Sequence, residues 1–333
     1  MNKTDVFALS LIKGLGKKSL FNIINSGLSI SELRSLDEDE LGNYIKGPGK
    51  VNAISAIHNQ FEFYQEKAES EIGNLNDNDI QLIAYTDDEF PFLYKKIPDP
   101  PIFLYVKGNH DLLNYRKGIA VVGTRECSEI GRNVAFNTAK YFAENDFNIV
   151  SGLAIGIDTA GHKGALDVNG KTTSIVTDVQ NIYPEENIQL SEDIINNGGL
   201  LISENPPGTF LHRGLLVSRD RLQSGLSLAV FPIETDIKGG TMHTVQFAQD
   251  QNRLLFCPDL LSSPKYPNNF SKSRGVIQLI NDGKAIAFSK SIYPEMLDKL
   301  KNHEMLLWEK SQDVEEKTIT QEQLTLKGLN DLS

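Results

Sequence analysis

The chain has 333 residues, 40% of them hydrophobic, and a formal net charge of −11. This size suits one large or two smaller globular domains, and the acidic balance argues against binding a polyanion over the whole surface. Two cysteines exclude a disulfide framework and favour a reducing cytoplasm. No apolar run approaches the roughly 20 residues that cross a bilayer, so we expect no membrane association.

Residues 1–75 are predicted to form a small helical module. Apolar positions recur at helical spacing, and Gly14 and Gly16 separate the first two helices, while "GPGK" at 47–50 precedes a later one. The stretch "IKGLGKKSL" resembles a helix-hairpin-helix, whose Gly-x-Gly turn can meet a DNA phosphate through backbone N–H groups. An ordinary helical packing unit is the alternative.

Residues 76–288 show a different pattern. Two short β-like runs, "QLIAY" and "IFLYV", precede a series of continuous apolar runs, each followed by a helical or irregular segment. This alternation predicts an α/β domain, with a mostly parallel buried sheet and helices on both faces. Residues 289–333 are predicted to be a helical, acidic C-terminal extension.

Ligands of open α/β sheets bind beyond the carboxyl ends of the strands, so the residues that follow each apolar run are candidates. A guanidinium at such a crevice can grip phosphate oxygens with two donors. The glycine-rich turn "SGLAIGID" lacks the middle glycine of a dinucleotide fingerprint but can still bring N–H groups to an anion. The candidates are Gly123, Thr124 and Arg125 in "GTRE", Ser151, Gly152 and Gly156 in "SGLAIGID", and Gly239, Gly240 and Thr241 in "KGGTMHT".

Other polar residues receive different predictions. Asp158 would repel a phosphate, so it and His162, which shares a helix face with it, are predicted to support the loop structurally. Arg219 and Arg221 are both candidate phosphate ligands; they lie two apart on a helix, so one can face the crevice while the other stabilises structure. By its position before a strand, Lys171 would be a solvated loop residue at the opposite end of the sheet.

Motifs for covalent catalysis or cofactor binding do not occur in the sequence. It has no zinc-ligand spacing, no G-x-S-x-G elbow and no Walker A motif. The residues expected at the crevice are cations, hydroxyls and glycines, which bind anions. We therefore expect no catalytic residue, no metal and no cofactor.

The motif series resembles the bacterial DNA-processing protein A family (DprA, also called Smf). It comprises "VVGTRECSEIG", "VSGLAIGIDTAGHKGAL", "YPEEN", "GGLLISENPPG", "SRDRLQSGLSLAVFPIE" and "GGTMHT…A…NRLLFCP", in that order. The resemblance implies an extended Rossmann-like fold behind a SAM-like helical module, single-stranded DNA binding without catalysis, dimerisation, and assistance to a RecA-type recombinase. It also matches Arg125 and Lys171 to basic residues of the family, which moves Lys171 into the predicted DNA site.

The chain departs from the family pattern at several positions. Asp220 stands between two arginines where the family usually has asparagine, and Asp178 replaces a glycine near the crevice. The turn "KGGTMHT" partly resembles that of LOG-type nucleotide phosphoribohydrolases. A nucleotide sensor or hydrolase of that type is therefore the alternative function, with Glu204, Glu234 and Asp178 as its acids and Glu234 as a candidate base.

Overall fold

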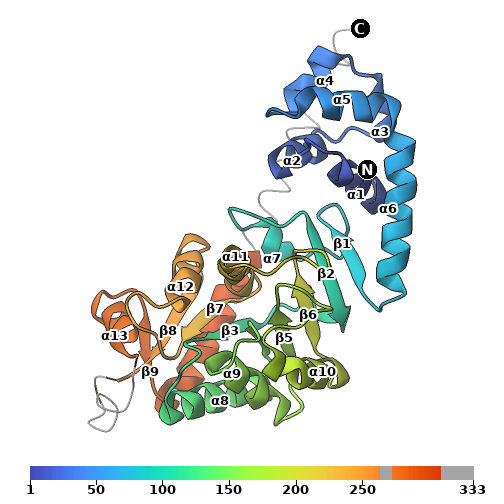
Figure 1. The fold of residues 1–333 in the computed structure, drawn as a ribbon. Coiled ribbons are helices and arrows are strands. Elements are labelled where there is room, and N and C mark those ends of the chain that lie inside the picture. The colour runs from blue at the N-terminus through green and yellow to red at the C-terminus, as the bar shows by residue number, and fades with distance from the viewer. Residues whose placement is uncertain (261, 263–271, 309–333) are drawn as a thin grey trace.

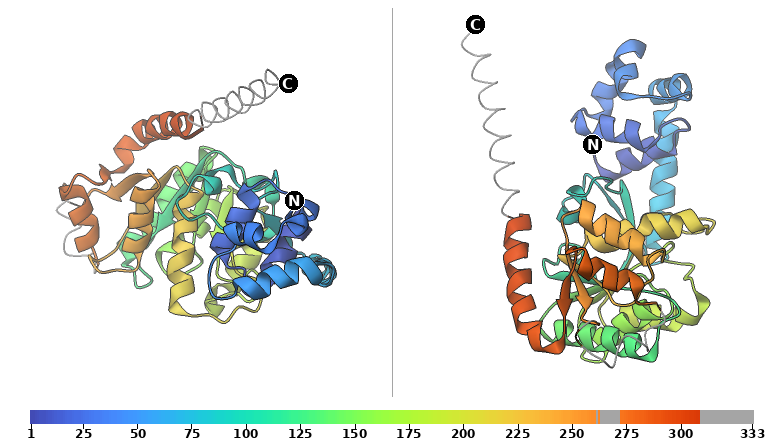
Figure 2. Two further views of the ribbon diagram at one scale, coloured as in Figure 1. Left: turned by 90° about the horizontal axis from the view of Figure 1, so that it is seen from above. Right: turned by 90° about the vertical axis from the view of Figure 1, so that its left-hand side faces the viewer.

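The computed structural model describes residues 1–260, 262 and 272–308. Of the predicted C-terminal extension, residues 293–308 form a helix that lies along the side of the sheet domain (Figure 2), and 309–333 lie outside the described residues. Within the described ranges, no helix combines the length and the apolar character that a membrane span requires.

Six helices come before the first strand and project from one edge of the sheet (Figure 1). Three of them begin with a capping box, in which the N-cap residues Asn2, Ser29 and Asp37 exchange hydrogen bonds with an acidic side chain three residues on. The Phe7 ring packs edge-on against Phe103 of the sheet at 5.4 Å, so one apolar core joins the helices to that edge. The helices are α1 (Lys3–Leu11), α2 (Lys17–Asn25), α3 (Ile30–Ser35), α4 (Glu38–Tyr44), α5 (Lys50–Asn59) and α6 (Phe61–Asn76).

The described strands form one nine-stranded sheet in the order β1-β2-β6-β5-β4-β3-β7-β8-β9. β1 and β2 are antiparallel to their neighbours, and all pairs from β6 to β9 are parallel. The predicted α/β fold with a mostly parallel sheet is confirmed. The strands are β1 (Gln81–Ala84), β2 (Phe103–Gly108), β3 (Gly118–Val122), β4 (Asn148–Ser151), β5 (Thr172–Ile175), β6 (Leu200–Ser203), β7 (Ala229–Pro232), β8 (Leu254–Pro258) and β9 (Ile286–Phe288).

Helices cover both faces of the sheet, because the side chains of each buried strand alternate between them. The helices after β1 are α7 (Phe92–Lys95), α8 (Glu129–Glu144), α9 (Ile157–Leu166), α10 (Ile188–Asn196), α11 (Arg213–Gly225), α12 (Thr241–Asp250) and α13 (Arg274–Asn281). In β3, Ile119 and Val121 pack with α8, α9 and residues 293–308, whereas Ala120 and Val122 pack with α11, α12 and α13.

Candidate functional site

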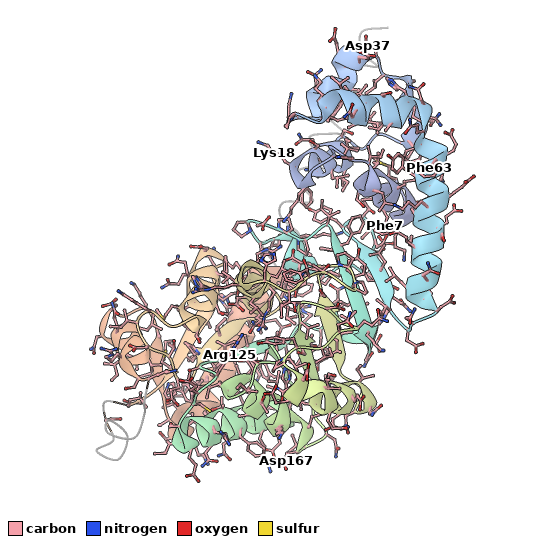
Figure 3. All side chains as sticks on the ribbon, in the orientation of Figure 1. Phe7, Lys18, Asp37, Phe63, Arg125 and Asp167 are labelled. Carbon is pink, nitrogen blue, oxygen red and sulfur yellow. The ribbon has the colours of Figure 1, made fainter. Side chains whose placement is uncertain are left out.

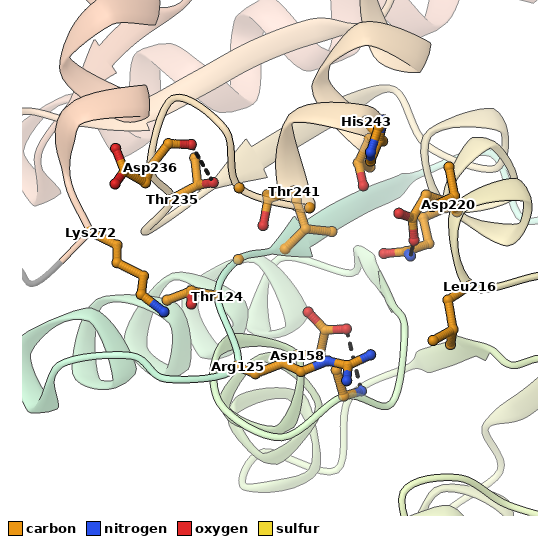
Figure 4. A pocket seen from close by; sticks show the side chains of 18 of the residues that line it. Thr124, Arg125, Asp158, Leu216, Asp220, Thr235, Asp236, Thr241, His243 and Lys272 are labelled. Carbon is orange, nitrogen blue, oxygen red and sulfur yellow. Dashed lines mark hydrogen bonds between the residues drawn. The ribbon is translucent and has the colours of Figure 1, made fainter. Parts of the chain in front are cut away.

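The connections of the parallel sheet reverse direction at β3. From β3 the chain proceeds through β4, β5 and β6 on one side, and β7, β8 and β9 lie on the other. Where the connections of two adjacent strands leave in opposite directions, a crevice forms outside the carboxyl ends of these strands. This crevice is the usual ligand site of such sheets. A cavity of about 660 Å³, which we call the switch-point cavity, opens there between the segment that follows β3, α11 and the segment that follows β7 (Figure 4).

The switch-point cavity brings together residues from four of the sequence motifs. Gly123, Thr124 and Arg125 follow β3, and the turn 238–241 follows β7. The Thr124 N–H donates to the Glu234 carbonyl at 2.8 Å, which ties the two turns to each other. Of the predicted phosphate ligands, the cavity is lined by Gly123, Thr124, Arg125, Arg219, Gly239, Gly240 and Thr241, and Asp158, which was predicted as a structural support, also lines it.

Three exposed cations surround the cavity. Arg125, Arg213 and Lys238 all line it, and none makes an ion pair with any residue in the described part of the chain. Figure 3 shows Arg125 near the centre of the sheet domain. Because no ion pair has to be broken before these cations turn toward a ligand, this group is suited to an anion with several charges.

Of these three cations only Arg125 was among the predicted site residues. A fourth cation, Lys272, was not predicted either. Its ammonium group lines the same cavity and lies 2.8 Å from a Glu126 carboxylate oxygen. The signal for it was the basic segment "SKSRG" soon after the β8 run "RLLFCP", since residues beyond a strand's carboxyl end belong to the crevice.

Arg219 forms part of the cavity wall while its side chain is almost completely buried. Its Nη1 donates to the Ile175 carbonyl at 2.9 Å, and its Nε lies 3.5 Å from Asp220. The same guanidinium lies against Gly152, where a Cβ would be 1.8 Å from Nη1. The absence of a side chain at position 152 therefore makes room for Arg219. Gly152 does not line the cavity, and neither does Ser151, which is buried and donates its hydroxyl to the Val121 carbonyl. This differs from the predicted phosphate cradle.

The loop between β4 and α9 is held in place by a close backbone contact at Gly156 and by a hydrogen bond to the Asp158 carboxylate. Gly156 has φ 89°, and a Cβ there would lie 2.5 Å from the carbonyl oxygens of Thr124 and Arg125, so only glycine permits this approach. The Asp158 carboxylate accepts from the Ala154 N–H at 3.4 Å. Burial raises the pKa of Asp158, against the opposing field of Arg219.

His162 is completely buried beneath the loop and does not line the cavity. Its Nδ1 lies 2.7 Å from the Thr172 hydroxyl, which itself donates to the Ile149 carbonyl, so Nδ1 is the donor of the pair. Burial lowers the pKa of His162 to about 4, and the ring is therefore neutral at physiological pH. These contacts are those of a structural residue.

Arg221 does not face the cavity, contrary to its inclusion among the predicted phosphate ligands. Both terminal nitrogens of its guanidinium donate to the Glu204 carboxylate at 2.6 Å, and its Nε donates to the Asp99 carbonyl at 2.9 Å. Its side chain is only 5% exposed. The cation is thus neutralised and enclosed, and has no free donor direction for a phosphate.

Lys171 lies at the opposite end of the sheet from Arg125. It immediately precedes β5, its ammonium group is 2.6 Å from Asp146, and it stands over the Tyr115 ring at 4.8 Å. Because parallel strands place all their amino ends at one edge, a residue before β5 cannot meet one after β3 within the same chain. The structure therefore does not bring Lys171 into the switch-point cavity.

The three acids of the alternative enzymatic hypothesis are all engaged elsewhere. Glu234 accepts from the N–H and the hydroxyl of Ser128, Glu204 pairs with Arg221, and Asp178 accepts from the Gly208 N–H. None of them lines the switch-point cavity. Among the described residues there is also no cluster of three or more acids, histidines or cysteines that could hold a metal ion.

Comparison with known proteins places the chain in a family. Residues 81–293 match the family model of DNA recombination-mediator protein A. The chain belongs to this family. It is 32% identical over 248 residues to DNA processing protein DprA of Bacillus subtilis, over 74% of this chain and 81% of that protein. The predicted membership is confirmed.

Solved structures of the family share the fold. The X-ray structure of DprA from Streptococcus pneumoniae superposes with a TM-score of 0.71 at 26% identity, over 87% of this chain and 96% of that one. A second structure, of DprA from Helicobacter pylori, has a TM-score of 0.57 at 28% identity, over 66% of this chain and 96% of that one. The latter is described as showing that protein's single-stranded DNA binding mode.

Proposed function

We propose that this chain binds the backbone of single-stranded DNA in the switch-point cavity and performs no chemistry on it. The observation that carries the proposal is the ring of three unpaired, exposed cations, Arg125, Arg213 and Lys238, around glycine-rich turns at the topological switch point. The described single-strand binding of the H. pylori relative supports the choice of ligand.

Binding of this kind is independent of base sequence. Guanidinium, ammonium and backbone N–H groups recognise phosphate oxygens, which are the same at every nucleotide. The local cations also explain how a chain of net charge −11 can bind DNA, because screening limits the reach of distant acids to about 8 Å at physiological salt.

Arg125→Ala tests this proposal. We expect lower affinity for a fluorescent oligo-dT across a salt series, with the log–log salt slope reduced by about 0.7 for one lost phosphate contact. The matched control is Arg132→Ala on α8, which removes an exposed arginine that also makes no ion pair with a described residue. Equal affinities for the two variants would contradict the proposal.

Lys171→Ala separates the two predicted parts of the site. Lys171 lies at the other end of the sheet. If the switch-point cavity of one chain holds the DNA, the Lys171→Ala variant is therefore expected to bind oligo-dT with an affinity within about twofold of that of the unmodified chain. A loss of oligo-dT affinity as large as that caused by Arg125→Ala would instead show that the DNA strand contacts both ends of the sheet, or the sheets of two protomers.

We also propose, from the family resemblance, that the chain works in the cytoplasm as a homodimer that loads a RecA-type recombinase onto single strands during DNA uptake, recombination or defence. Two cavities on one strand would raise the apparent affinity through effective concentration. Light scattering measures the dimer, and the rate at which recombinase filaments form on protein-coated single strands measures the loading. A monomer, or an unchanged filament rate, would contradict the respective part.

A further inference from the structure

The helical module carries the pattern I-K-G-x-G-K twice, at residues 12–17 and 45–50. The first copy joins α1 to α2, and the second joins α4 to α5. The match to the family model begins only at residue 81, so this module lies outside the part that defines the family.

The two copies share the backbone geometry of the isoleucine and the first glycine, and differ at the second glycine, where ψ is 168° for Gly16 and 5° for Gly49. Ile12 and Ile45 end their helices with extended backbone, at ψ 117° and 122°. Gly14 and Gly47 follow with φ 104° and 108°, a conformation that favours glycine. The second glycine of each copy then stands as the N-cap of the next helix. The chain thus builds one helix-hairpin-helix turn twice, where the sequence pointed to a single one.

The two turns lie against each other and form one continuous surface. A Cβ on Gly14 would be 2.6 Å from the Gly49 carbonyl oxygen, and a Cβ on Gly49 would be 2.5 Å from the Gly14 Cα. Gly16 and Gly47, by contrast, have open space where a side chain would stand. The backbone of both turns is therefore accessible from outside.

The paired turns carry a local concentration of positive charge in an acidic protein. Lys13 and Lys18 are exposed and make no ion pair with any residue in the described ranges, and Lys46 donates only to the Gly42 carbonyl, at 3.3 Å. No acid occurs between residues 12 and 18 or between 45 and 51. The five lysines of this surface are Lys13, Lys17, Lys18, Lys46 and Lys50, of which Lys17 forms an ion pair with Asp99.

The helices that follow the two turns begin without a side-chain cap. α1, α3 and α4 have capping boxes, whereas α2 and α5 begin at glycine and, like α6, have no side-chain cap. The first N–H of α5, that of Lys50, donates to the Gly47 carbonyl at 3.2 Å, so the N–H groups left for a ligand are those of the first turn of α2 and those that follow Lys50 in α5. Lysines and free N–H groups together are complementary to phosphate oxygens.

We propose that the paired turns bind the backbone of duplex DNA, as a second nucleic-acid surface distinct from the switch-point cavity. Two equivalent turns in contact suit a ligand with two phosphate backbones side by side, and in B-DNA these border a minor groove about 6 Å wide. A single strand offers only one backbone. Lys18 on the helical module and Arg125 on the sheet domain lie on separate parts of the molecule (Figure 3), so one chain could hold a junction of duplex and single strand.

The test uses the full chain with the double variant Lys13→Glu, Lys46→Glu, which changes one exposed lysine in each turn. The probes are a labelled 20-bp duplex and an oligo-dT of the same length. We expect duplex affinity to fall about tenfold, with a salt slope reduced by about 1.8 for two phosphate contacts, and oligo-dT affinity to stay within twofold. Circular dichroism verifies that the helices remain folded.

The matched control, Lys67→Glu with Lys299→Glu, makes the same change in net charge at exposed lysines away from the turns. Three results would overturn the proposal: no duplex binding by the unmodified chain, equal duplex affinity for the two double variants, or equal losses on duplex and single strand. Arg125→Ala is measured in parallel and is expected to weaken only oligo-dT binding. Failure of the single-strand proposal is thereby distinguished from failure of this one.

Discussion

The guanidinium of Arg219 occupies the space that a side chain on Gly152 would fill, with Nη1 1.8 Å from the position of a Cβ there. This contact connects the loop after β4 to α11, and through the hydrogen bond from Arg219 to the Ile175 carbonyl it reaches the end of β5. The glycine motif therefore shapes the switch-point cavity indirectly, by allowing a buried cation to form its wall.

Gly152→Ala is expected to destabilise the protein by about 1–3 kcal/mol, because the added methyl group must displace a buried, hydrogen-bonded guanidinium. Urea unfolding measures the loss. The matched control is Gly73→Ala in the exposed face of α6, where a Cβ would meet no atom within 4 Å. That change should leave stability equal or raise it by up to about 1 kcal/mol. Equal stability of the two variants would show that Arg219 moves aside without cost.

Arg221→Ala is expected to destabilise the fold by about 3–5 kcal/mol, since it leaves the Glu204 carboxylate without its bidentate partner. The pair is well enclosed, with side chains 5% and 17% exposed. The double variant Arg221→Met, Glu204→Leu should recover most of the loss, because it removes both charges. Urea midpoints test both statements. A double variant as unstable as the single one would assign the loss to packing rather than to the unpaired acid.

Much of the fold and part of the site could be predicted from the sequence. The alternation of apolar runs and helices specifies the parallel sheet, and the rule for strand ends then selects Thr124, Arg125 and Gly240 as neighbours. These predictions need only local pattern and topology. The structure brings those residues to one cavity.

The partner of a charged side chain could not be predicted in this way. Arg221 looks like a phosphate ligand in sequence, but it pairs with Glu204 and also bonds to Asp99, 122 positions away. Local reasoning about strand ends placed Lys171 far from Arg125, as in the structure, and the family match drew it into the site. Such choices depend on tertiary neighbours, which pattern and spacing do not contain.

Glu185→Lys is expected to strengthen single-strand binding. A second cavity, of about 400 Å³, adjoins Arg125 and is lined on its other side by Tyr183, Pro184, Glu185 and Glu186. Both glutamates are exposed, so they place negative charge beside the principal predicted phosphate ligand. Reversal of one charge should add a phosphate contact and raise the magnitude of the salt slope by about 0.7. Glu192→Lys on α10 is the control, and equal gains for both would indicate a general charge effect.

Asp220 is expected to make anion binding in the switch-point cavity depend on pH. Its carboxylate lines the cavity and accepts from the Gln223 Nε2 at 2.9 Å. Burial raises the pKa of Asp220 to about 6; the field of Arg219 opposes this shift, and that of Asp158 adds to it. Above pH 6 the group is ionised and repels an anion in the cavity, whereas below pH 6 it is neutral. Phosphate binding should therefore take up a proton and strengthen as the pH falls.

Asp220→Asn is expected to abolish this dependence, because asparagine is neutral at every pH and keeps a similar shape. Between about pH 7.5 and 5.5 the unmodified chain should gain about sixfold in affinity for oligo-dT if binding raises the pKa of Asp220 by about one further unit. The variant should already bind more tightly at the upper end of this range. Since His243 lines the same cavity, both series are repeated with His243→Gln. If the pH profiles with and without Asp220→Asn run parallel in that background, another group carries the effect.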